Sequence, residues 1–147
     1  MIHLCRTAWR IRIGRPSGVQ NAKMMTFLSI AVFGTVGCWG RYGMTNLVQT
    51  FAGRQFPYAT LSINLLGSFL MGFLSVATLQ RLPLPPSLRT GILTGFVGGY
   101  TTFSTFAMEA ILLSEQGQQR RAILYLLVSE ALGLCLVFAG SYFGQMI

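Results

Sequence analysis

Four long stretches of this sequence carry almost no charge, and they constrain the fold more than any other feature. Three of them contain no charged residue at all: Met25–Gly40, Phe56–Gln80 and Thr90–Met108. The fourth, Ala122–Ile147, carries only Glu130. A helix needs about 20 apolar residues to cross a bilayer, and the first stretch reaches this length if Arg41 lies at its end. We therefore predict four membrane-spanning helices.

The composition agrees with a protein that lives in a lipid bilayer. The 147 residues have a mean hydropathy of +0.58, and 10% of them are charged, against about 25% in soluble domains. Open sheets leave backbone groups unsatisfied in lipid, so the spans are helices. The fold class predicted is an all-α, multi-pass integral membrane protein. Residues 24–147 form one four-helix transmembrane domain, because the short loops leave no room for a second.

Residues 1–23 form a basic N-terminal tail outside this domain. Five of the eleven basic residues lie there: Arg6, Arg10, Arg12, Arg15 and Lys23. The tail lacks the long apolar run of a cleavable signal peptide. Two interpretations stay open, namely an arm that touches anionic lipid and an upstream start, with Met24 or Met25 the true first residue. Because the excess charge is concentrated here, the net charge of +8 is not taken as a sign of nucleic-acid binding.

The other basic residues give a weak orientation signal. They flank the three loops, with four on one side of the membrane and two on the other. Without the tail, this bias is too small to fix one topology, and the chain can insert both ways. With the tail counted, the N-terminus is expected in the cytoplasm.

The third apolar stretch contains residues that suit a membrane helix poorly. It reads GFVGGYTTFSTFAME from Gly95 to Glu109, and glycine and threonine are weak helix formers. Irregular backbone at membrane depth is tolerated only where protein or a cavity covers it. Carbonyl groups released there can bind a hard cation such as Na⁺. We predict a broken third helix, with a simple packing kink as the alternative.

Polar side chains on two other stretches point to a path through the bundle. Asn64 lies deep in the second stretch with Ser68 one turn later, and Tyr125 and Ser129 repeat this spacing in the fourth. Such groups either hold helices together or line a polar track. Arg41 has two comparable interpretations, a side chain that reaches to the lipid headgroups and an inward residue that attracts anions.

The third stretch itself presents two different faces. Phe103 and Phe106 share one face, where their positive ring edges can surround a small anion, although such a pair is more often ordinary core. The residues Thr102, Thr105 and Glu109 share another face and can extend a polar path.

These residues resemble the signature of the Fluc (CrcB) fluoride channels. The stretch GFVGGYTTFSTFAME is similar to the third-helix signature of that family. GRYG at Gly40–Gly43, ATLSINLLGSF at Ala59–Phe69, and Tyr125 with Ser129 follow the family order. The resemblance extends from about Met25 to the C-terminus.

The resemblance implies an antiparallel, dual-topology homodimer in the bacterial inner or plasma membrane. It implies two fluoride pores, a structural Na⁺ at the dimer interface, and passive export of cytoplasmic fluoride that lowers its toxicity. The backbone carbonyls of Gly98 and Thr101 would bind Na⁺. The implied pore residues are Phe103, Phe106, Asn64, Ser129, Tyr125, Thr102 and Thr105, with Arg41 at the vestibule and Glu109 near the end of the third helix.

Three positions depart from the family pattern. Ala107 and Gly133 stand where relatives often have hydroxyl residues, so the polar track is expected to be shorter or wetter. Glu130 is not a position associated with the family. Because a fixed negative charge would slow anions, we expect Glu130 to point away from the path or to be neutral.

Other functions fit the sequence less well. A dual-topology, proton-coupled small multidrug exporter needs a carboxylate in its first helix, and Met25–Gly40 has none. A structural subunit would explain the glycines but not Asn64 together with GGYTTFSTF. An enzyme is not expected, because His3 is the single histidine and no nucleophile–base pair or phosphate loop is present.

Overall fold

The computed structural model describes residues 17–147, and this part of the chain is built from helices. The α-helices are α1 (Ser17–Ala52), α2 (Tyr58–Val76), α3 (Pro86–Thr90), α4 (Gly98–Tyr100), α5 (Phe103–Glu115) and α6 (Gln119–Met146). Two π-helical segments, η1 (Ala77–Arg81) and η2 (Gly91–Val97), continue α2 and α3.

Four helical spans in the described residues are long and apolar enough to cross a membrane. They are Gly18–Ala52, Tyr58–Arg81, Pro86–Glu115 and Gln119–Met146. This confirms the predicted number of spans and the all-α, multi-pass fold class.

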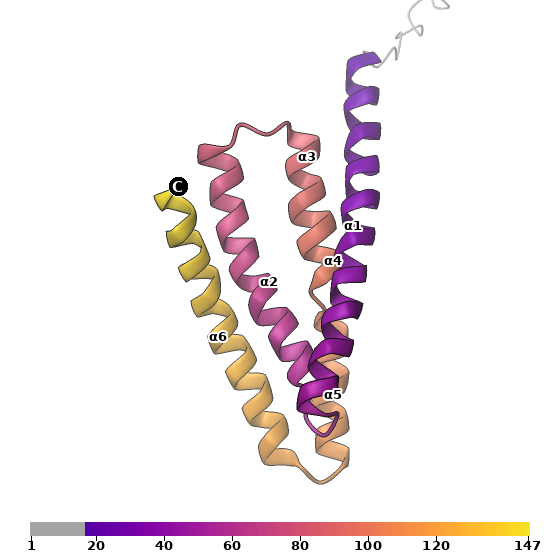
Figure 1. The fold of residues 1–147 in the computed structure, drawn as a ribbon, viewed down its shortest axis with the longest axis vertical. Coiled ribbons are helices and arrows are strands. Elements are labelled where there is room, and N and C mark those ends of the chain that lie inside the picture. Colours follow the sequence, from indigo (N-terminus) through magenta and orange to yellow (C-terminus); the bar gives the residue numbers. More distant parts are fainter. Residues whose placement is uncertain (1–16) are drawn as a thin grey trace, which may run out of the picture.

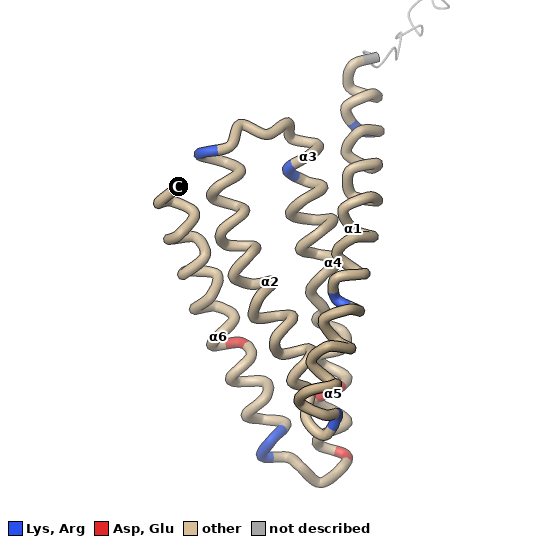
Figure 2. The backbone as a smooth tube through the Cα atoms, in the orientation of Figure 1, with Lys and Arg blue, Asp and Glu red and all other residues tan. Residues whose placement is uncertain are grey.

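The four spans run alternately in opposite directions (Figure 1). The connection from α2 to α3 lies at the same end of the bundle as the C-terminus and the start of α1. Helices α2 and α6 lie side by side, and α1 packs along η2 and α4. Charged residues gather mainly towards the two ends of the bundle, as Figure 2 shows.

Glycines allow these helix pairs to approach closely. A Cβ on Gly37 of α1 would collide with the backbone carbonyl of Phe96, and one on Gly140 of α6 would collide with that of Phe69. Small residues at such crossings let helix backbones come into van der Waals contact in lipid. Gly37 is such a close-packing site, whereas a Cβ on Gly43 would meet open space.

Helix α1 is longer at both ends than the sequence suggested. It continues through Arg41 to Ala52 and stops at Gly53, whose φ of +74° suits glycine. The expectation that Arg41 lies at the helix end is therefore wrong. Residues 17–23 of the expected tail belong to α1, and the rest of that tail lies outside the described residues.

Candidate functional site

The helical backbone of the third span is interrupted at Thr101 and Thr102. Helix α4 ends at Tyr100, and both threonines have extended backbone, with ψ of 160° at Thr101 and φ of −150° at Thr102. Helix α5 then begins at Phe103. The hydroxyl of Thr102 accepts a hydrogen bond from the Thr105 N–H at 3.3 Å, so it caps the new helix.

Asn64 of α2 holds the extended segment in place. Its Nδ2 donates to the carbonyl oxygen of Thr102 at 3.0 Å, and the Thr102 N–H donates to its Oδ1 at 2.9 Å. The amide therefore satisfies two backbone groups that have left the helix. Asn64 therefore links two helices, one of the two roles that the sequence left open for it. One of its two amide hydrogens remains available for another acceptor.

The interruption deprives two carbonyl groups of their usual donors. In a continuous α-helix the Gly98 carbonyl would accept from the N–H of Thr102, and the Thr101 carbonyl from that of Thr105. Here the Thr102 N–H bonds Asn64, and the Thr105 N–H bonds the Thr102 hydroxyl. Gly98 and Thr101 thus keep acceptor oxygens that the helix does not use.

A cavity of about 340 Å³ lies beside this interruption. Its polar lining comes from Asn64, Ser68, Thr101, Thr102, Ser129 and Glu130, and its aromatic lining from Phe103 and Phe106. The Ser129 Oγ is buried and has no hydrogen-bond partner, one of two such side-chain atoms in the described residues. A buried hydroxyl without a partner marks a place where water or another ligand can bind.

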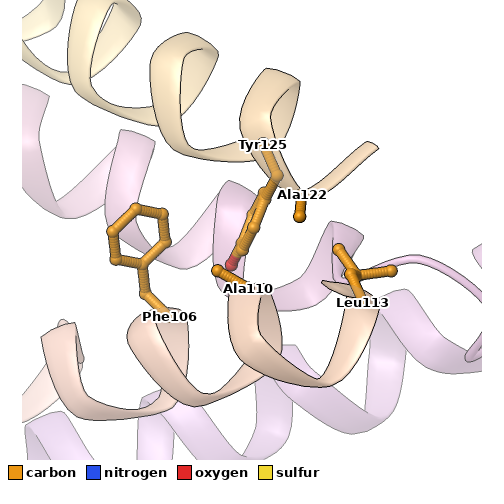
Figure 3. Packing of buried hydrophobic residues seen from close by; sticks show 5 residues of the cluster. All are labelled: Phe106, Ala110, Leu113, Ala122 and Tyr125. Carbon is orange, nitrogen blue, oxygen red and sulfur yellow. The ribbon is translucent and has the colours of Figure 1, made fainter. Parts of the chain in front are cut away.

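The two phenylalanines differ sharply in their surroundings. Their ring centroids are 5.8 Å apart. Phe103 is 74% exposed, whereas Phe106 is 5% exposed and belongs to a buried cluster with residues of α5 and α6. Figure 3 shows this cluster, formed by Phe106, Ala110, Leu113, Ala122 and Tyr125. Phe106 is therefore both a core residue and part of the cavity wall.

Tyr125 lies in this cluster and does not line the cavity beside Ser129. Its ring centroid is 5.0 Å from that of Phe106, and its hydroxyl donates to Oε2 of Glu109 at 2.9 Å. The hydroxyl of Thr60 donates to the other carboxyl oxygen at 2.8 Å. Glu109 is thus held by one donor from α2 and one from α6.

A second cavity, of about 560 Å³, lies on the other face of α5. Arg41, Thr60, Thr102, Thr105 and Glu109 are among the residues that line it. The Arg41 guanidinium also contacts Sγ of Cys38 at 3.8 Å. The structure therefore brings Arg41 and the polar face of α5 to one cavity, apart from the aromatic face.

Thr60 is the site residue that the sequence reasoning missed. It lies one turn before Asn64 and shares its helix face, because residues four apart on a helix lie above one another. Its burial, with 5% of its surface exposed, could have been suspected from that spacing. The signal that could have identified Thr60 is a hydroxyl residue on the same helix face as Asn64, whose amide lies deep in the span.

Glu130 is among the residues that line the cavity of Phe103, Phe106 and Ser129. The expectation that it points away from the anion path or is neutral stays a prediction.

Most of the chain matches the model of a known protein family. The model of the family described as "CrcB-like protein, Camphor Resistance (CrcB)" matches residues 28–141, most of the chain. The chain belongs to the CrcB family. This confirms the resemblance on which the sequence interpretation relied.

Similar proteins of the CrcB family carry names that describe a channel. "Fluoride-specific ion channel FluC" of Acidithiobacillus ferrooxidans (strain ATCC 53993 / BNL-5-31) is 53% identical over 117 residues, which cover 80% of this chain and 94% of that protein. The protein of the same name from Geobacter sulfurreducens is 46% identical with the same coverage. That of Hydrogenobaculum sp. is 38% identical and is covered completely. These names agree with a multi-pass membrane protein that is not an enzyme.

Proposed function

We propose that this chain is a fluoride-specific ion channel that exports cytoplasmic fluoride passively and so lowers its toxicity. The observation that carries the proposal is the cavity beside the interrupted third span. Phe103, Phe106, Asn64 and Ser129 line it, in a chain that is 53% identical to a protein named as a fluoride-specific channel.

The chemistry of this cavity suits a small, strongly hydrogen-bonding anion. Ser129 offers a hydroxyl without a protein partner, and Asn64 offers its second amide hydrogen. Aromatic ring edges add weak positive potential. No Lys or Arg is among the described residues that line the cavity, so an anion would be stabilised by donors without the tight binding that a full positive charge gives.

A passive pathway is sufficient for export. Hydrogen fluoride enters an acidified cell as a neutral acid and dissociates there, which leaves the anion inside. A negative interior favours the exit of one such charge by about 2.3 kcal/mol per 100 mV. Export therefore needs a selective pore but no coupled energy source.

The functional unit we propose is an antiparallel homodimer. In one subunit, Phe103 and Glu130 of the cavity wall are exposed, which would place a polar cavity against lipid, and a second copy would cover it. The described residues carry three basic residues towards each end of the bundle, Lys23, Arg81 and Arg89 at one and Arg54, Arg120 and Arg121 at the other. For residues 17–147 alone, such a balance favours insertion in both orientations, whereas the basic residues of the tail would favour a cytoplasmic N-terminus.

The proposal includes a structural Na⁺ at the centre of the dimer. The carbonyl oxygens of Gly98 and Thr101 in both copies would hold it, and their loss of helical donors makes them suitable for this role. Oxygen donors of this kind suit a hard cation. The ion would compensate the negative ends of the carbonyl dipoles that the interruption leaves in the membrane.

A fluoride-efflux assay in liposomes tests the proposed function. The full-length chain, loaded with fluoride and driven by a membrane potential, is expected to release fluoride and to retain chloride. The variant Phe106→Ile is expected to lose this flux. Efflux driven by a proton gradient and indifferent to the membrane potential would instead favour a proton-coupled exporter, and equal release of chloride would refute fluoride specificity.

A further inference from the structure

The polar cavity contains one feature that the proposed fluoride pathway does not need, the carboxyl group of Glu130. Glu130 is the twelfth of the 28 residues of α6, about 16 Å beyond the start of that helix. Figure 2 shows the acidic position on α6 well away from both ends of the bundle. Glu130 therefore lies at membrane depth and among the residues that line the cavity that we assign to the anion.

Glu130 is the single ionisable side chain among the described residues of the cavity wall. The other described lining residues, from α2, the third span and α6, have apolar or uncharged polar side chains. No positive charge in this wall offsets the carboxyl group.

The cavity around Glu130 offers polar groups and space for water. Ser68, Ser129 and Asn64 line the same cavity and provide hydrogen-bonding groups. A cavity of about 340 Å³ has room for several waters at about 30 Å³ each. Glu109 differs, because Thr60 and Tyr125 bind both of its oxygens within the protein.

We propose that Glu130 limits permeation: its negative charge lowers the occupancy of the cavity by anions and sets the fluoride concentration at which the pathway fills. The inference rests on the proposed fluoride channel, adds a residue that tunes it, and replaces the expectation that Glu130 points away from the path or is neutral. Like charges within one cavity repel each other, and the repulsion acts on every anion that enters. Water and the polar groups of the wall reduce this repulsion without removing it.

The test compares the full-length protein with Glu130→Gln in planar bilayers, where fluoride current is measured against fluoride concentration. At low ionic strength the variant is expected to carry about tenfold more current at low fluoride, and to half-saturate at about tenfold lower fluoride. A second neutral variant, Glu130→Ala, is expected to show the same two changes.

Two further variants separate charge from structure. Glu130→Asp keeps the carboxylate and is expected to keep the current and the half-saturating fluoride concentration of the unmodified protein. Glu115→Gln removes an exposed carboxylate at the end of α5 that is not part of the cavity wall, and its current should match that of the unmodified protein.

The outcomes distinguish this inference from the proposed function. Fluoride current in the unmodified protein with an unchanged current in Glu130→Gln overturns the inference alone. Absence of fluoride current from both proteins overturns both proposals. If Glu130→Gln does not fold, Glu130→Ala takes its place, and an unchanged fluoride current in that variant overturns the inference.

Discussion

Asn64 and Thr102 exchange two hydrogen bonds across the place where the third span loses its helical backbone. The side-chain amide donates to the Thr102 carbonyl at 3.0 Å and accepts from the Thr102 N–H at 2.9 Å. In lipid, a backbone group without a partner costs several kcal/mol. This pair therefore allows extended backbone to exist at membrane depth, and it releases the Gly98 carbonyl from its helical donor.

Replacing Asn64 by Ala should weaken both the fold and the transport. The substitution leaves two buried backbone groups of Thr102 without partners, each at a cost of about 1–3 kcal/mol. We expect a lower thermal midpoint in detergent and loss of fluoride efflux from liposomes. Ser62→Ala is the matched control, because the Ser62 hydroxyl bonds only the Tyr58 carbonyl of its own helix. A variant at Asn64 as stable as this control would contradict the clamping role.

Replacing Ser129 should lower transport but not stability, because its buried Oγ has no partner within the protein. Ser129→Ala removes no protein hydrogen bond, so the thermal midpoint is expected to stay within the range of about 0.5 kcal/mol seen for neutral substitutions. Fluoride efflux should fall, since the cavity loses a donor. Unchanged efflux, with the protein folded, would mean that this hydroxyl does not face the permeating ion.

Replacing Tyr125 should lower the stability of the protein more than replacing Ser129. Tyr125→Phe removes the hydroxyl that bonds the Glu109 carboxylate at 2.9 Å, a type of bond worth about 1.5–3 kcal/mol. The buried ring itself stays in place against Phe106. A double-mutant cycle with Thr60→Val, which removes the second donor, should show coupling, because both donors serve one carboxylate. Strict additivity of the two midpoint shifts would argue that they act independently.

The sequence was sufficient to predict the four membrane spans, because hydropathy and charge are local properties. It could not reveal the pairing of Asn64 with Thr102, which lie 38 residues apart and meet only when α2 packs against the third span. The same limit applies to Thr60 and Glu109, whose contact joins residues 49 apart. Asn64 was recognised as costly in lipid, but its partner could not be named.

The error at Arg41 has a physical cause. It followed from the rule that charge avoids the membrane interior, which holds for lipid and fails for a cavity inside a bundle. Arg41 lies within α1 and lines a cavity with Glu109. Which face of a helix meets a cavity depends on the packing of its neighbours, and the sequence pattern of α1 did not encode it.

Substitutions of the two phenylalanines should both reduce fluoride conduction but differ in their effect on stability. Phe103→Ile and Phe106→Ile both remove a ring edge from the cavity and are expected to reduce fluoride efflux by at least about tenfold, a barrier increase of about 1.4 kcal/mol. Only Phe106→Ile should lower the thermal midpoint of the subunit, because Phe106 is buried and pairs with Tyr125 at 5.0 Å. Such an aromatic pair is worth about 0.5–1.5 kcal/mol. Equal midpoint shifts for the two variants would show that the exposed Phe103 is packed in the assembled protein.

Removal of Na⁺ tests whether the carbonyls of Gly98 and Thr101 hold a cation. With Na⁺ replaced throughout purification by a large organic cation, the thermal midpoint should fall and the dimer should dissociate more readily. A ligand at about 100 times its dissociation constant stabilises the folded state by about 2.7 kcal/mol, so the midpoint should rise with the logarithm of Na⁺ concentration. Asn64→Ala should weaken this dependence, because it frees the Thr102 N–H to compete for the Gly98 carbonyl, whereas Ser62→Ala should retain it. A thermal midpoint that does not change with Na⁺ concentration in any variant would refute the structural Na⁺. It would not bear on the proposed anion cavity.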